Sequence, residues 1–282
     1  MTTAAITPRR LLFGSLLIAL PLALAYGPVC AGLVRQWADD PNYAHGFFVG
    51  PMAAWLAWRR RAPYAAAPRR PEAAGFGLVA LGAILYLAGT AAAELFTARV
   101  SLVVVAAGLL WALEGRARAR VMAFPVAFLV CMVPLPYVIY YQFTFPLQVA
   151  SSRWAAGLLG LAGMPVVREG NILHLEGYSL EVVTACSGLR SIMTLGTMAL
   201  FLSDFLRLSR GLKALLVAAT IPVAVAANVL RLAITASVAA IAGAKTAESF
   251  LHELSGLVVF IGGLVALVVI GKGMEWIERA RR

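Results

Sequence analysis

Three side chains that could act together in acyl transfer occur in separate parts of the sequence. Cys186 lies in ACSGLR (185–190), Arg231 ends NVLR (228–231), and His252 begins HELSG (252–256). A cysteine attacks as the thiolate, and a helix amino terminus or a nearby cation lowers the pKa of a thiol. A histidine can move the proton, while an arginine can stabilise an oxyanion or hold a substrate carboxylate. These residue types suit acyl transfer only if the fold brings them together.

The elements that must position them are membrane helices. Of the 282 residues, 61% are hydrophobic and 13% are charged, whereas a soluble domain is about half apolar and a quarter charged. Apolar runs of about 20 residues cross the hydrocarbon core as helices. Residues 1–282 therefore predict a single all-α polytopic membrane domain. We expect about eight transmembrane helices, near 11–31, 44–58, 74–94, 98–114, 120–141, 187–204, 211–232 and 252–272, and we interpret the first as a retained helix rather than a cleaved signal peptide.

The distribution of positive charge predicts the orientation. If the amino terminus is cytoplasmic, most of the 24 Lys and Arg residues fall in cytoplasmic segments, as membrane proteins prefer. An even number of spans then leaves both termini in the cytoplasm. The net charge of +11 thus reflects membrane topology. Outside the spans no basic stripe carries interleaved aromatic residues, so the sequence argues against nucleic-acid binding.

An extracytoplasmic cap is predicted at about 142–186, before the sixth helix. In its second half, residues 171–175 and 179–183 read as short strands separated by a turn at Glu176. We expect a small β-hairpin on the outer membrane surface that ends at Cys186. The half of the chain that would carry the chemistry is then about 165–272.

Counting the spans places Cys186, Arg231 and His252 near one external interface. Cys186 would precede the amino terminus of the sixth helix, with Arg190 and Arg231 as neighbouring cations. Each residue alone also has a structural interpretation: Cys186 as a small apolar filler, Arg231 as an interfacial arginine and His252 as a polar residue at a helix start. Ser187 is an alternative nucleophile for a serine protease. If the chain re-crosses the membrane between Arg231 and His252, the three residues separate and the mechanism fails.

The other cysteines favour a structural role. Cys30 and Cys131 lie within predicted spans, where a cysteine usually packs as a small apolar residue. Because two of the three cysteines are predicted to be buried in the membrane, we expect no disulfide framework.

The ordered motifs resemble those of exosortases, in the exosortase/archaeosortase family. The cysteine motif is TACSGLR (184–190), the arginine motif is NVLR (228–231), and His252 is followed by Gly256 and Phe260. The segment NYAHGFFVGP (42–51) also resembles the beginning of the family's second span. The resemblance runs from about Trp37 to Phe260.

The resemblance implies a membrane cysteine protease or transpeptidase of the bacterial inner membrane, with an extracytoplasmic active site and a link to exopolysaccharide and biofilm production. Its substrates would be exported proteins with a PEP-CTERM tail: a Pro-Glu-Pro motif, a transmembrane helix and an Arg-rich end. By this resemblance Cys186 is the nucleophile, Arg231 the stabilising cation and His252 the acid/base. We expect substrate contacts from Arg190, Ser187, Asn228 and His45, membrane lipid as surroundings, and neither a metal nor a cofactor.

Two other classes of protein remain open from the sequence. One is a non-enzymatic polytopic component of polysaccharide export, in which the three residues make structural contacts. The other is a small-molecule transporter, which should place charged or broken-helix positions near the bilayer midplane. The candidate residues gather at one interface instead, and this placement favours chemistry on a membrane-anchored substrate.

Overall fold

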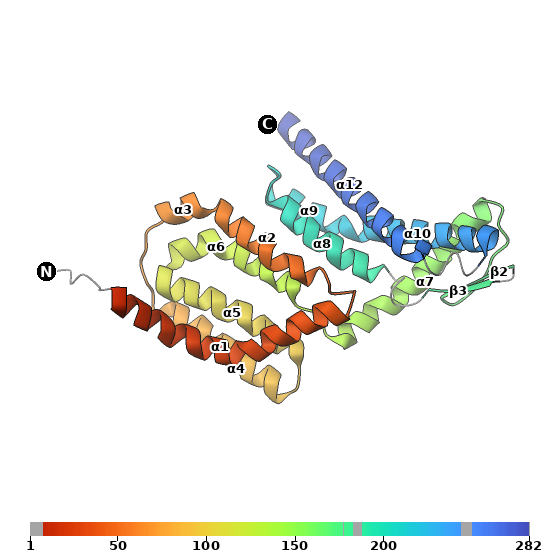
Figure 1. The fold of residues 1–282 in the computed structure, drawn as a ribbon. Helices are drawn as coiled ribbons and strands as arrows, with labels where there is room; N and C mark the ends of the chain where they lie inside the picture. Colours follow the sequence, from red (N-terminus) through yellow and green to blue (C-terminus); the bar gives the residue numbers. More distant parts are fainter. Residues whose placement is uncertain (1–7, 177, 183–187, 244–249, 282) are drawn as a thin grey trace. The chain divides into compact units, whose positions relative to one another are not determined.

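The computed structural model describes residues 8–176, 178–182, 188–243 and 250–281, which divide into two compact units (Figure 1). The first unit ends at Pro136 and the second begins at Tyr137. Helices make up most of both units. The single functional domain stays a prediction.

The first unit consists of helices joined by short turns. Glu94 caps the amino terminus of one of them, since its carboxylate accepts the backbone N–H groups of Phe96 at 3.0 Å and Thr97 at 2.7 Å. The helices are α1 (Pro8–Asp39), α2 (Gly46–Arg59), α3 (Arg61–Ala66), α4 (Ala74–Ala91), α5 (Leu95–Glu114) and α6 (Arg116–Phe128), followed by the 3₁₀ helix η1 (Leu129–Met132).

Helices α4 and α5 pack unusually closely because glycines line their interface. Gly75, Gly82 and Gly89 recur every seven residues along α4, and each faces the backbone or a short side chain of α5. A Cβ atom on Gly89 would lie 2.6 Å from the backbone nitrogen of Ala98. Such small-residue interfaces hold membrane helices together, because lipid gives no hydrophobic drive for pairing.

The second unit combines helices with one small sheet. Its helices are α7 (Tyr137–Leu161), α8 (Leu189–Ser203), α9 (Arg210–Ala218), α10 (Thr220–Ala242) and α12 (Phe250–Ala280), and its strands are β1 (Val167–Glu169), β2 (Ile172–Leu175) and β3 (Tyr178–Glu181). A core that includes Leu195, Leu216, Ala224 and Leu267 joins α8, α9, α10 and α12.

The sheet is antiparallel, in the order β1-β2-β3, with Leu173 paired to Arg168 on one side and to Leu180 on the other. Leu173 and Val182 are fully buried in a core shared with α7 and α10. The predicted strands correspond to β2 and β3, and β1 makes the sheet one strand larger than a hairpin. The sheet is therefore anchored on the helices of its own unit.

Not all the predicted spans appear as single helices. Four helical stretches are long and apolar enough to cross a membrane among the described residues, or five if α6–η1 and α7 count as one broken span. The four are Ala74–Ala91, Leu95–Glu114, Arg210–Ile241 and Gly256–Ala280. The described residues thus support a multi-pass arrangement, while the number eight stays a prediction.

Two predicted boundaries were wrong. The expected helix at 120–141 is interrupted after Met132, where Pro134 and Pro136 cannot donate backbone hydrogen bonds. The first part of the expected cap is instead helical, since α7 continues to Leu161.

The glycine interface can be tested by adding one methyl group at a time. Gly89→Ala should lower the free energy of unfolding of the protein in detergent by about 1–3 kcal/mol, because the new Cβ meets the α5 backbone. Gly77→Ala is the matched control on the same helix, since nothing lies within 4 Å of its Cβ position, and it should be neutral or stabilising. Equal midpoints of thermal unfolding for the two variants would contradict the proposed close packing.

Candidate functional site

The site is built around the start of α8, where the chain turns sharply into the helix. Gly188 is the N-cap residue, with φ 85° and ψ −10° in the left-handed region, and α8 begins at Leu189. The predicted helix amino terminus shortly after Cys186 is confirmed, two residues later than expected. Its free N–H groups give this position a partial positive charge. Cys186 and Ser187 themselves lie outside the described residues.

Asn228 fixes the start of α8 against α10. Its side chain is 1% exposed, and a Cβ atom on Gly188 would lie 3.2 Å from the Asn228 Cβ. The Asn228 Nδ2 donates a hydrogen bond to Oγ of Ser151, on α7, at 3.3 Å. Three helices therefore meet at Asn228, next to the residue that caps α8.

Arg231 follows Asn228 on α10 and reaches the beginning of α12. A Cβ atom on Gly256 would lie 3.8 Å from Nη1 of Arg231, so the guanidinium faces the α12 backbone at Gly256. His252 belongs to α12 and precedes Gly256 by four residues, about one helical turn; the structure does not describe its side chain. The arginine and histidine motifs are thus brought together through Gly256.

The predicted end of the seventh helix was too early. It was expected near 232, but α10 continues to Ala242. Arg231 therefore lies within a helix rather than at its end. Despite the longer helix, its guanidinium remains next to α12, so the extension does not separate Arg231 from that helix.

A polar face of α7 belongs to the same neighbourhood, and sequence reasoning missed it. The Ser152 hydroxyl donates to the carbonyl oxygen of Gly170 at 3.0 Å, which ties α7 to the turn between β1 and β2. Gln148 is four residues after Thr144 and three and four residues before Ser151 and Ser152, a spacing that indicates one helix face. This spacing could have revealed the polar face from the sequence. The buried members of this face are Thr144, Gln148, Ser151 and Ser152.

The remaining predicted contacts are distributed over both units. Arg190 is partly exposed in the first turn of α8, and its carbonyl oxygen accepts from the Thr194 hydroxyl at 2.9 Å. His45 belongs to the first unit and precedes α2. It is 8% exposed, and its Nδ1 has no hydrogen-bond partner among the described residues. The candidates other than His45 belong to the second unit.

The comparisons with known proteins point to one family. A family model described as transmembrane exosortase (Exosortase_EpsH) matches residues 37–269, which is most of the chain. The matched range includes the cysteine, arginine and histidine motifs and His45. Neither the comparison with curated proteins nor that with solved structures gave a match.

The turn before α8 should tolerate no side chain at Gly188. Gly188→Ala adds a Cβ at positive φ, which costs about 1–2 kcal/mol, and also presses on Asn228. Gly163→Ala is the control, since it has positive φ but nothing within 4 Å of its Cβ position. We expect a lower midpoint of thermal unfolding for Gly188→Ala than for Gly163→Ala. Indistinguishable midpoints would show that the contact with Asn228 is not needed.

Proposed function

We propose that this chain is a membrane cysteine peptidase or transpeptidase with Cys186 as its nucleophile. The premise is that the chain belongs to the transmembrane exosortase family. The family is one of membrane-embedded cysteine peptidases and transpeptidases, and membership suggests a role in protein processing and sorting. The residue roles, the substrate and the orientation given below are parts of this proposal.

The observation that carries the proposal is the approach of Arg231 to Gly256, next to the contact between Asn228 and Gly188. Gly188 belongs to the cysteine motif and Gly256 to the histidine motif. Asn228 and Arg231 are three residues apart and are neighbours on the surface of α10. The cysteine motif and the histidine motif therefore flank the same stretch of α10.

The proposed chemistry needs only these three side chains. The thiolate of Cys186 attacks the substrate carbonyl carbon, and the carbonyl oxygen takes on negative charge that the Arg231 guanidinium stabilises. His252 donates a proton to the leaving amine as the C–N bond breaks, which leaves a thioester on Cys186. Water or an amine acceptor then attacks the thioester and releases the cysteine.

The proposed substrate is an exported protein with a PEP-CTERM tail. Its Pro-Glu-Pro motif would lie just outside the inner membrane, at the depth of the cysteine motif, with the basic end of its own helix in the cytoplasm. The substrate carboxylate would pair with Arg190 or Arg231, because a carboxylate at an interface needs a cation. Ser187 and Asn228 would form the surrounding substrate contacts, and His45 of the first unit stays a predicted substrate contact. In this arrangement the protein crosses the membrane eight times, with both termini cytoplasmic, and serves exopolysaccharide and biofilm production.

Replacing the proposed nucleophile tests the reaction class. Cys186→Ala should abolish processing of a reporter protein that carries a PEP-CTERM tail, while the variant still accumulates in the membrane. The wild type should form a hydroxylamine-sensitive thioester adduct that the variant lacks. Cys30→Ala and Cys131→Ala are the controls and should keep normal processing. Normal processing by Cys186→Ala would sink the nucleophile assignment.

The placement of Arg231 can be perturbed without changing Arg231. Gly256→Ala should be tolerated, because its Cβ would make an ordinary contact of 3.8 Å. Gly256→Leu should displace the guanidinium and lower the rate of processing by about 10–100-fold, somewhat less than the loss of a full oxyanion donor. Gly262→Leu is the control on the same helix, since nothing lies within 4 Å of its Cβ position. Equal rates for the two leucine variants would contradict the role given to Arg231.

A further inference from the structure

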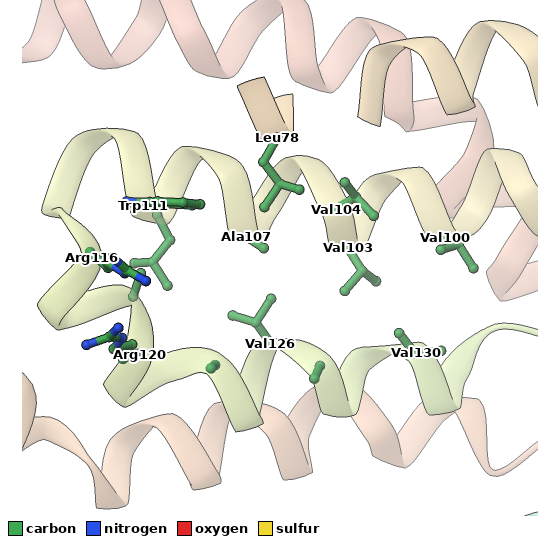
Figure 2. Close-up of a pocket in the computed structure, with 14 residues that line it drawn as sticks. Leu78, Val100, Val103, Val104, Ala107, Trp111, Arg116, Arg120, Val126 and Val130 are labelled. Atoms are coloured by element: carbon green, nitrogen blue, oxygen red, sulfur yellow. The ribbon is translucent and has the colours of Figure 1, made fainter. Parts of the chain in front are cut away.

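A second candidate site lies entirely in the first unit. Helices α5 and α6 line an open groove of about 510 Å³ (Figure 2), which is within the range of small-molecule sites. Most of its lining side chains are aliphatic. Ala107 on α5 and Ala123 and Ala127 on α6 keep it wide, since each is too short to fill the space. The groove can therefore hold an apolar chain.

One end of the groove is cationic. Figure 2 shows Arg116 and Arg120 together where α5 turns into α6, opposite the end marked by Val100 and Val130. Both arginines are exposed. In the described part of the chain, Glu114 forms ion pairs with two other arginines, Arg69 and Arg118. No ion pair in that part involves Arg116 or Arg120.

Glu72 is a carboxylate beside this cationic end. It accepts hydrogen bonds from the Trp111 indole N–H at 2.8 Å and from the Arg116 backbone N–H at 3.3 Å. These hydrogen bonds, the first being the larger effect, lower the pKa of Glu72, so it is ionised at neutral pH. Two guanidinium groups against one carboxylate leave the end of the groove positively charged.

The length of the groove matches one leaflet of a bilayer. Val100 and Trp111 lie eleven residues apart on α5, or about 17 Å at ~1.5 Å per residue. Half of the ~30 Å hydrocarbon core is about 15 Å. Trp111 at the cationic end is the residue type that membrane proteins concentrate at the headgroup level. The arginines thus lie where lipid phosphates would be.

We propose that this groove binds one anionic phospholipid from the leaflet that faces Arg116 and Arg120. An acyl chain fills the aliphatic part, and the phosphate lies between the two guanidinium groups, which bind phosphate through paired hydrogen bonds. In the orientation proposed above this is the cytoplasmic leaflet. The site does not depend on the proposed peptidase activity.

The charge at the groove's end argues against other occupants. A transmembrane helix with an Arg-rich end, such as that of the proposed substrate, would bring positive charge against Arg116 and Arg120. A second copy of this chain would bring its own arginines to the same level. Free phosphate would satisfy the arginines but leave the aliphatic groove unfilled. An anionic lipid satisfies both the charge and the apolar surface.

Binding can be measured with the purified full-length protein in nanodiscs or detergent, using labelled phosphatidylglycerol and phosphatidylcholine. Wild type should prefer phosphatidylglycerol, and a millimolar excess of inorganic phosphate should not displace it. Arg116→Gln with Arg120→Gln should weaken phosphatidylglycerol binding by roughly 30-fold, at about fivefold per arginine. Arg210→Gln with Lys213→Gln removes two charges elsewhere and should change binding less than about twofold on the same scale.

Two further variants separate the acyl chain from the headgroup. Ala123→Phe with Ala127→Phe fills the groove and should abolish binding of both lipids with the arginines intact. Arg116→Lys with Arg120→Lys keeps both positive charges and should retain a preference for phosphatidylglycerol. This pair can be measured even if the glutamine pair cannot be purified. Any one of three results would overturn the proposal. These are undiminished lipid binding in the glutamine or phenylalanine variants, loss of the preference for phosphatidylglycerol in the lysine pair, and displacement of the lipid by inorganic phosphate.

Discussion

The structure depends on close approach between helices at glycine. Lipid tails are as apolar as the side chains they surround, so membrane helices gain little from hydrophobic burial and associate through tight packing. In the second unit Gly188 faces Asn228, Gly256 faces Arg231, and Gly263 faces Leu195. Each pair brings α8, α10 or α12 against a neighbour. Two of these glycines leave room for the polar side chains of Asn228 and Arg231 between helices.

Helix α10 is the element on which the candidate site is assembled. The apolar stretch that contains it begins at Arg210 and reaches Ile241. Arg231 lies 21 residues after Arg210, about 32 Å along a helix, which is close to the ~30 Å of hydrocarbon. If Arg210 lies at one membrane interface, as proposed, Arg231 lies near the other. The helix continues past Arg231. Helices α8 and α12 of the same unit pack against α10.

The sequence could predict elements whose signal is local. Long apolar runs located α4, α5 and α12, and alternating residues located β2 and β3. It missed most of α7, because Gln148, Ser151 and Ser152 lower its hydropathy, and these side chains are buried against the rest of the unit. It also could not predict the contacts of Gly188 and Gly256, since these depend on which faces of separate helices meet. The motifs were visible in the sequence, but the packing that joins them was not.

We propose two different uses for positive charge in this chain, and the sequence alone does not separate them. Arg116 and Arg120 are exposed at the end of an aliphatic groove, where guanidinium groups can meet lipid phosphate at the membrane surface. Arg231 is only partly exposed and faces α12 at Gly256, so water screens its charge less. A cation in that position acts most strongly on charge that develops beside it. In the proposed orientation, topology accounts for basic residues on the cytoplasmic side, whereas the position of Arg231 needs a separate reason, for which we propose charge stabilisation during acyl transfer.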